Sequence, residues 1–153
     1  MAKFDSKFSD AKMSAGFLLW KVSNLHQRLQ KKALEPLDLT PSQFSVLACY
    51  FFLLNKTESV SQSDLCSHAG IDKMLVSDLT KTLLKKGFIK SSKNKADRRS
   101  FKISVTEEGI RTCNKALKII EALDADFFGQ SPRQADFLEI MQELASSEMG
   151  NAK

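Results

Sequence analysis

Apolar residues recur along the first part of the chain with the period of a helix. From about residue 10 to residue 34 the steps are mostly three and four, while lysine, arginine and glutamine take the opposite face, which predicts an amphipathic helix. Pro36 ends it, because proline has no N–H to continue the helical hydrogen bonds. The apolar stripe consists of Leu18, Val22, Leu25 and Leu29.

Three further helices have recognisable starts. The sequence "TPSQ" at 40–43 predicts a capping box with a proline in the first turn, and it opens a mostly buried helix containing "FSVLACYFFLL". Thr106 is expected to cap a long helix whose apolar stripe reaches Phe127, and two glutamates suit its first turn. The sequence "SPRQ" at 131–134 predicts the start of a last helix, with Phe137 on its apolar side.

The centre of the chain has two short helical patterns separated by a tight turn. They cover roughly residues 62–69 and 73–86, and "AGID" joins them. Ser61 and Asp72 are suitable N-caps for the two helices, and Gly87 ends the second. This spacing is typical of a helix-turn-helix.

Two short strands follow these helices. "FIKSS" and "SFKISV" have the composition of strands, and the basic loop "KNKADRR" joins them as a hairpin. In the second strand, Phe101, Ile103 and Val105 fall on one face, with Lys102 and Ser104 on the other. The order of elements predicts a single, mainly α-helical domain with a small antiparallel β-hairpin wing, which is a winged helix-turn-helix.

Positive charge is concentrated in the same region. The whole chain carries +5, from 23 Lys plus Arg against 18 Asp plus Glu. Between Lys81 and Lys102, nine basic residues and one acid give a local charge of +8, which leaves −3 for the rest of the chain. Such a local field suits a polyanion such as DNA, although a solvated loop explains a run of charge equally well.

The second short helix divides into a packing arc and an outward arc. At about 100° per residue, the packing arc holds Leu75, Val76, Leu79 and Leu83, and the outward arc holds Lys73, Met74, Ser77, Asp78, Lys81 and Lys85. Short polar side chains and lysines on such an arc can reach base edges and phosphates in the major groove. An ordinary amphipathic surface helix shows the same division, so this feature alone leaves both interpretations open.

The hairpin loop carries a more specific pattern. On an extended segment Asp97 and Arg99 project to the same side, so the carboxylate can orient the guanidinium. An oriented arginine suits the narrow minor groove, and Lys93, Lys95 and Arg98 suit phosphate contacts, whereas the alternative is a surface ion pair without function. The candidate DNA-binding residues are therefore Lys73, Met74, Ser77, Asp78, Lys81, Lys93, Lys95, Asp97, Arg98 and Arg99.

Three stretches carry a family resemblance. "DRRSFKISVTEEG", residues 97–109, resembles the wing of the MarR family of transcription regulators, in which Asp-x-Arg precedes an alternating strand, a threonine and a glycine. "LDLTPSQFSVL" resembles the family's entry into its second helix, and "GIDKMLVSDLTKTLLKKGFI" resembles its recognition helix. The likeness spans about residues 18–128.

The resemblance implies a homodimer that binds a pseudopalindromic operator as a repressor responsive to a small molecule or an oxidant. Residues of about 10–38 and 107–148 would form the helical dimerisation region, and about 40–105 the DNA-binding region. Surplus apolar residues on the terminal helices are consistent with a dimer, because obligate interfaces resemble a divided core. Asp78 departs from the family pattern, which often has a basic residue there, so it must accept from a cytosine amine or pair with a neighbouring lysine.

Other functions have little support in the sequence. No phosphate-binding loop, nucleophile motif or catalytic carboxylate pair is present, so neither an enzyme nor a cofactor is expected. His26 and His68 are too few for a metal site. The rival interpretation is a winged-helix interaction module whose basic face docks an acidic partner protein.

The apolar runs and cysteines point to an ordinary cytoplasmic protein. No run has the length of a membrane span, and the start of the chain has no signal-peptide pattern. Three cysteines without a CxxC motif argue against disulfides. Cys49 and Cys113 are expected in the core, and so is Cys66, although partial exposure would allow it redox chemistry.

Overall fold

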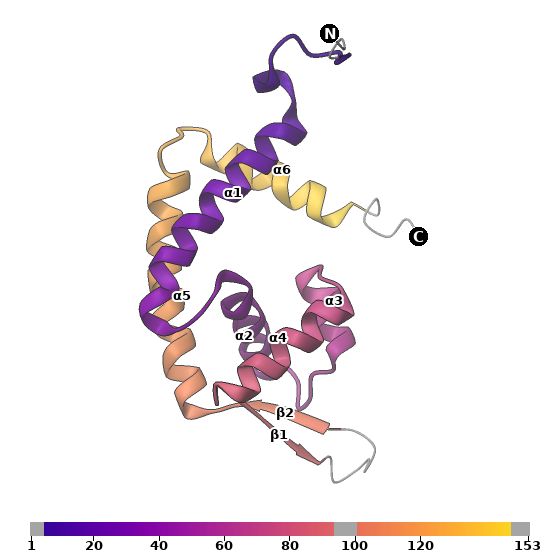
Figure 1. Cartoon of the computed structure of the whole chain (residues 1–153), viewed down its shortest axis with the longest axis vertical. Helices are drawn as coiled ribbons and strands as arrows, with labels where there is room; N and C mark the ends of the chain where they lie inside the picture. The colour runs from indigo at the N-terminus through magenta and orange to yellow at the C-terminus, as the bar shows by residue number, and fades with distance from the viewer. Residues whose placement is uncertain (1–4, 94–100, 148–153) are drawn as a thin grey trace. The chain divides into compact units, whose positions relative to one another are not determined.

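The computed structural model of the chain consists of helices and one hairpin, as predicted, and describes residues 5–93 and 101–147. Contacts divide the chain into two compact units, Met1–Ile120 and Glu121–Lys153. In chain order the elements are η1 Ala11–Met13, α1 Ala15–Leu34, η2 Glu35–Leu37, α2 Pro41–Leu54, α3 Gln62–Ala69, α4 Lys73–Lys85, β1 Ile89–Lys93, β2 Phe101–Val105, α5 Glu107–Phe128 and α6 Gln134–Ser146 (Figure 1).

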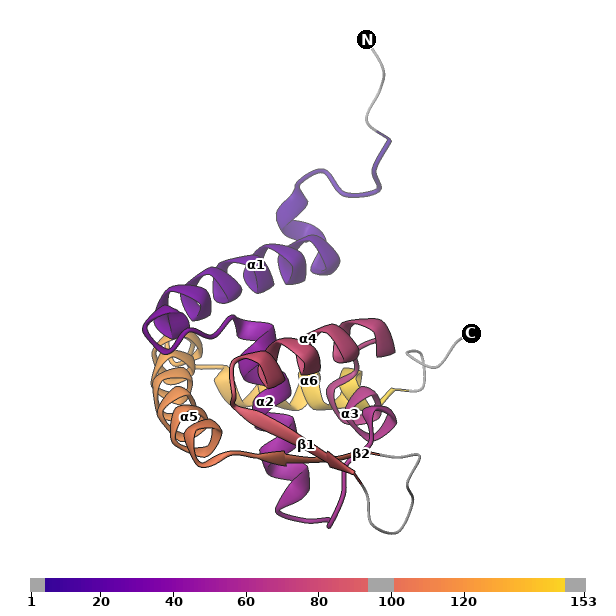
Figure 2. The ribbon, with the colours of Figure 1, turned by 60° about the horizontal axis from the view of Figure 1, so that its bottom comes forward.

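The winged helix-turn-helix lies within the first unit. α2 contacts α3 and α4, α3 contacts α4, and the end of α4 leads into β1 beside it (Figures 1 and 2). β1 and β2 pair antiparallel, in a register that joins Ile89 to Val105 and Lys93 to Phe101. Gly70 ends α3 at φ +65° and Gly87 follows α4 at φ +75°, left-handed conformations that glycine adopts without steric cost.

Side-chain caps fix the helix starts of this unit where the sequence predicts them. Thr40 Oγ1 accepts from Gln43 N at 3.2 Å, and Gln43 Oε1 accepts from Thr40 N at 3.2 Å, which completes the predicted capping box. Ser61 and Asp64 form a second box, and hydrogen bonds from the Ser61 hydroxyl and N–H lower the pKa of Asp64. The Asp72 carboxylate accepts from a backbone N–H of α4 at 2.9 Å.

The first long helix starts later than predicted. Asp10 does not begin α1, because its carboxylate accepts from Lys12 N at 2.8 Å and caps the separate turn η1. Ser14 caps α1 instead, with its hydroxyl accepting from Phe17 N at 3.3 Å. The predicted end at Leu34 is confirmed.

The prediction that Ser131 caps the last helix is wrong. Its hydroxyl accepts from Arg133 N at 3.2 Å, which stabilises the turn before α6. Arg133 occupies the N-cap position without a side-chain cap bond, and its guanidinium pairs with Asp136 at 3.0 Å. α6 therefore begins at Gln134, three residues beyond the predicted cap.

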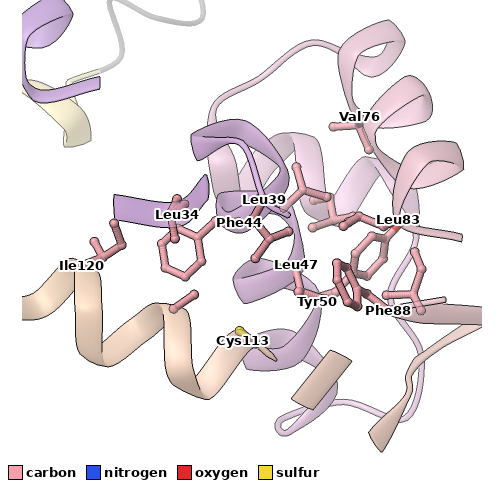
Figure 3. Packing of buried hydrophobic residues seen from close by; sticks show 14 of the residues in the cluster. Leu34, Leu39, Phe44, Leu47, Tyr50, Val76, Leu83, Phe88, Cys113 and Ile120 are labelled. Atoms are coloured by element: carbon pink, nitrogen blue, oxygen red, sulfur yellow. The ribbon is translucent and has the colours of Figure 1, made fainter. Parts of the chain in front are cut away.

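The core of the first unit lies among α2, α4, α5 and the base of the hairpin (Figure 3). A buried polar pair in this core joins Tyr50 of α2 to Thr80 of α4, with 3.0 Å between the hydroxyl oxygens, and burial raises the pKa of Tyr50. The buried apolar residues are Leu34, Leu39, Phe44, Val46, Leu47, Tyr50, Val60, Leu65, Val76, Leu83, Phe88, Ile89, Cys113, Ala116 and Ile120.

Both terminal helices leave apolar side chains exposed in the single chain. Within α1 the predicted stripe of Leu18, Val22, Leu25 and Leu29 is 38% to 42% exposed, and Trp20 is 63% exposed. In the second unit Phe128 stacks on Phe137 with 5.7 Å between ring centroids, yet no residue of α6 is buried. The exposed apolar residues of α6 are Phe137, Leu138, Ile140, Met141 and Leu144.

Among residues 5–93 and 101–147, no single helix is long and apolar enough to cross a membrane. The segments Ala15–Leu37 and Pro41–Leu54 satisfy the length and composition of a span only when taken together, and they meet at 72°. The second of them contains much of the buried core, and a core helix meets the same criterion.

Candidate nucleic-acid interface

The outward face of α4 holds five of the predicted DNA-binding residues together. Lys73, Met74, Asp78 and Lys81 are exposed, Met74 by 76%, and Ser77 is half-buried. The opposite face is fixed in the core, where Val76 and Leu83 are fully buried. Asp72 caps the start of α4, next to Lys73 and Met74 of the outward face. The cap holds the first turn of α4 in a defined conformation.

One residue of the predicted packing arc lies outside it. Leu75 is 41% exposed, whereas Thr80 is buried at 5% and bonded to Tyr50. The buried residues centre on the direction of Val76 and Leu83, and at about 100° per residue Leu75 lies about 90° from that centre while Thr80 lies only about 50° away. Counting only apolar residues shifted the predicted arc toward Leu75.

Asp78 pairs with a neighbouring lysine, one of the two outcomes that the sequence left open. Lys81 Nζ lies 3.3 Å from Asp78 Oδ1, one helical turn further on, and both side chains are largely exposed. An exposed pair of this kind is worth about 0 to 1 kcal/mol, so it exchanges readily with other partners. The pair reduces the repulsion that an isolated carboxylate would exert on phosphate.

The hairpin presents two cations that the predicted site did not include. Lys90 pairs in register with Ser104, and Ser92 with Lys102, so these four side chains share one face. Lys90 and Lys102 are exposed, whereas Ile103 packs against the core from the other face. Two signals in the sequence could have identified these lysines. The strand alternation puts Lys102 on the outward face, and both lysines lie in the segment of concentrated positive charge.

The predicted wing residues Lys95, Asp97, Arg98 and Arg99 lie outside the described residues. Lys93 ends β1 opposite Phe101, and its side chain is likewise not described. The orientation of Arg99 by Asp97 therefore stays a prediction.

The base of the hairpin is tied to the neighbouring helices through one threonine. The Thr106 hydroxyl donates to Gly87 O at 2.7 Å and accepts from Gly109 N at 3.0 Å, as the predicted cap of α5. Gly109 packs so closely that a Cβ there would lie 2.0 Å from Phe88 O. The end of α4, the start of β1, the end of β2 and the start of α5 therefore meet at one closely packed junction, which fixes where the hairpin leaves the helices.

The cysteines and acidic residues form no metal site within residues 5–93 and 101–147, where no three His, Cys, Asp or Glu side chains come together. Cys113 is fully buried, and burial, followed by the nearby Cys49, raises its pKa to about 11. Burial also raises the pKa of Cys49, which is half-buried. Cys66 is half-buried and packs against the core.

Comparisons with known proteins agree with this geometry. The MarR family profile matches residues 39–101. The HTH-type transcriptional regulator YdcH of Bacillus subtilis (strain 168) is 40% identical over 146 residues, covering 95% of this chain and 99% of YdcH. CouR from Rhodococcus jostii RHA1, solved with p-coumaroyl-CoA, is similar in structure with a TM-score of 0.76 and 26% identity, over 91% of this chain and 96% of that chain. A mutant MarR from E. coli, solved with operator DNA, has a TM-score of 0.76 and 20% identity, over 93% and 100%.

The hairpin, α3 and α4 define a winged helix-turn-helix protein of the regulator class. The extent of the match to YdcH and the match to the family profile then identify the family within this class. The chain belongs to the MarR family and is a transcription regulator, which confirms the resemblance seen in the sequence.

Proposed function

We propose that two copies of this chain bind a pseudopalindromic operator as a ligand-responsive repressor. The observation that carries the proposal is the division of α4: its outward face is polar and exposed, while its other face is held by the core. An α-helix fits the major groove, and a helix fixed in this way presents the same side chains at every encounter.

The residues on the outward face of α4 have separate roles in this proposal. Ser77 and Asp78 face base edges, with Asp78 able to leave Lys81 and accept from a cytosine amine. Lys73 and Lys81 contact phosphates, and Met74 makes apolar contacts such as those with thymine methyl groups.

The hairpin extends the contact to the neighbouring minor groove. Arg99, oriented by Asp97, enters that groove, where the negative potential is enhanced. Lys93, Lys95 and Arg98 contact phosphates beside it, and the exposed Lys90 and Lys102 enlarge the positive field.

Dimerisation uses the exposed apolar faces of α1 and α6. Each of these helices carries leucine and other apolar side chains that stay exposed in the described part of the single chain. An obligate dimer removes such surface from water and stabilises by about 25 cal/mol per Å² of apolar area. Two-fold pairing of the subunits then matches the two-fold symmetry of an operator.

A hollow in the first unit is our candidate for the effector site. It has a volume of about 370 Å³ and is lined by residues of α2 and its C-cap Asn55, together with His68 and Leu117. Phe52 stacks on His68 at 5.3 Å between ring centroids, so the site offers a flat aromatic surface. A ligand there would shift α2 and with it the recognition helices. That a relative, CouR, was solved bound to p-coumaroyl-CoA supports a role for a small-molecule ligand. Action in the cytoplasm follows from this role.

Selection of genomic fragments by the purified protein tests the proposal. We expect enrichment of one pseudopalindrome whose half-sites lie about 10 base pairs, or one helical turn, apart. Enrichment of no sequence, with equally weak binding to all duplexes, would instead favour the rival function, a module that docks an acidic protein.

A further inference from the structure

A second hollow, of about 400 Å³, lies where the end of α1, the α1–α2 connection and the end of α4 meet. Three cations from α1 and one from the end of α4 line it, together with two carboxylates. Four cations against two carboxylates leave a net charge of +2 around a concave space. The charged lining residues are Arg28, Lys31, Lys32, Lys86, Glu35 and Asp38.

Lys86 is held in this hollow by three acceptors. Its ammonium lies 3.0 Å from Asp38 Oδ2 and donates to Gln43 Oε1 at 3.2 Å and to the Asp38 carbonyl. The Lys86 side chain is only 21% exposed, whereas that of Asp38 is 84% exposed. Because an ammonium has three donors, a new anion can reach Lys86 only by replacing one acceptor. Asp38 is the acceptor most easily replaced, because water can hydrate its exposed carboxylate when Lys86 leaves it.

The three α1 cations are not neutralised in the same way. Among the described residues, Arg28, Lys31 and Lys32 form no ion pair with a carboxylate, although Glu35 lines the same hollow. Lys31 and Lys32 stand in the last turn of α1. Close to them α2 begins after Thr40, another lining residue, and the partial positive charge of a helix N-terminus adds to the field.

We propose that this hollow binds a small phosphorylated molecule. Arg28, Lys31 and Lys32 hold its phosphate, and Lys86 exchanges the Asp38 carboxylate for a phosphate oxygen. Phosphate is the anion that this lining favours, because several donors of different orientation can engage its three free oxygens at once. The site is separate from the effector hollow and does not depend on how the chain binds DNA.

The position on α4 distinguishes this site from a contact with DNA backbone. The proposed groove face begins at Lys73, whereas Lys86 follows the last residue of the 13-residue helix. At 1.5 Å per residue the two ends lie about 20 Å apart, and a recognition helix contacts bases through its N-terminal residues. The hollow is therefore at the end of α4 away from the expected groove.

Isothermal titration of the full-length protein with inorganic pyrophosphate, at constant ionic strength, tests the proposal. We expect saturable binding that is at least tenfold weaker in Arg28→Gln/Lys31→Gln/Lys32→Gln. The matched control, Lys12→Gln/Lys115→Gln/Lys118→Gln, removes the same charge from exposed positions outside the hollow and should bind as the parent does. No saturable binding, or equal loss in both triple variants, would overturn the proposal.

A single substitution tests the exchange at Lys86. Asp38→Asn removes the competing charge but keeps a residue type that tolerates the φ of +52° at this position. We expect pyrophosphate to bind several times more tightly to this variant, and weaker or unchanged binding would contradict the exchange. If the hollow triple variant instead keeps its pyrophosphate affinity but flattens the salt dependence of DNA binding, the bound phosphates belong to DNA and the proposal is wrong.

Discussion

Gly109 controls how closely α5 can approach the hairpin. A Cβ at this position would lie 2.0 Å from Phe88 O and 2.8 Å from Val105 Cγ1, and backbone cannot yield as a flexible side chain can. We expect Gly109→Ala to lower the free energy of unfolding by about 1–3 kcal/mol, measured by urea denaturation.

Gly16 provides the matched control, because a Cβ there meets nothing within 4 Å and the residue lies within α1. Gly16→Ala should stabilise slightly, by about 0.5–1 kcal/mol, through the lower backbone entropy of alanine in the unfolded chain. Equal effects of the two substitutions would show that close packing at Gly109 is not the cause.

Cys113 is expected to be unreactive in the native protein. Burial raises its pKa from 9.0 to about 11, so at pH 8 its thiolate is about a hundredfold rarer than that of an ordinary cysteine. Iodoacetamide labelling followed by mass spectrometry should modify Cys113 only after urea is added. Rapid labelling in native buffer would contradict the buried position.

The raised pKa of Cys113 makes the free energy of unfolding depend on pH. Folding favours the neutral thiol of Cys113, so its contribution is complete below the unfolded pKa of 9.0 and is lost as pH rises toward about 11. Cys113→Ala should flatten the stability profile in that alkaline range, relative to the parent.

At the level of elements, the caps predict a clear contrast between two helix starts. Asp72 caps α4 through a 2.9 Å bond, whereas Ser131 caps no helix. Asp72→Ala should cost about 1 kcal/mol in urea denaturation and Ser131→Ala much less. A cost at Ser131 as large as that at Asp72 would mean that the hydroxyl supports α6 after all.

Local patterns sufficed for most elements and failed where two local interactions compete. "TPSQ" and "SPRQ" have the same cap pattern, yet only Thr40 forms the box. Near the second pattern, the Ser131 hydroxyl accepts from the N–H two residues ahead, and Arg133 pairs with Asp136.

The burial of Thr80 depends on a distant residue instead. Tyr50, 30 residues earlier, supplies its hydrogen-bond partner, and the periodicity of apolar residues carries no information about that contact.

For the whole molecule, the exposed faces of α1 and α6 predict a dimer. Leu138→Glu/Leu144→Glu places charges on an apolar face that is exposed in the single chain, so the first unit should keep its fold. Sedimentation velocity should show a dimer for the parent and a monomer for this variant. Met74→Glu, at an even more exposed apolar residue of α4, should remain dimeric, and a monomeric parent would refute the assembly.

Contacts between residues far apart in the chain could not be predicted from the sequence. Lys86, just beyond the last residue of α4, belongs to the basic run by position, but its ammonium bonds Asp38, 48 residues away. The sequence shows Lys86 only as one of the nine basic residues between Lys81 and Lys102, and it is not among the predicted DNA-binding residues. The core fixes which lysines share a surface, and that depends on packing rather than on neighbours in the sequence.

Fluorescence anisotropy with the selected genomic fragment measures whether the protein recognises one DNA sequence. Parent protein should bind that fragment about a thousandfold or more tightly than a shuffled duplex, with affinity falling steeply between about 50 and 200 mM salt. Arg99→Ala should remove most of that preference while Lys118→Ala, on α5, keeps it. Equal binding of the parent to both duplexes, or an Arg99→Ala variant indistinguishable from the parent, would contradict recognition of DNA by α4 and the wing.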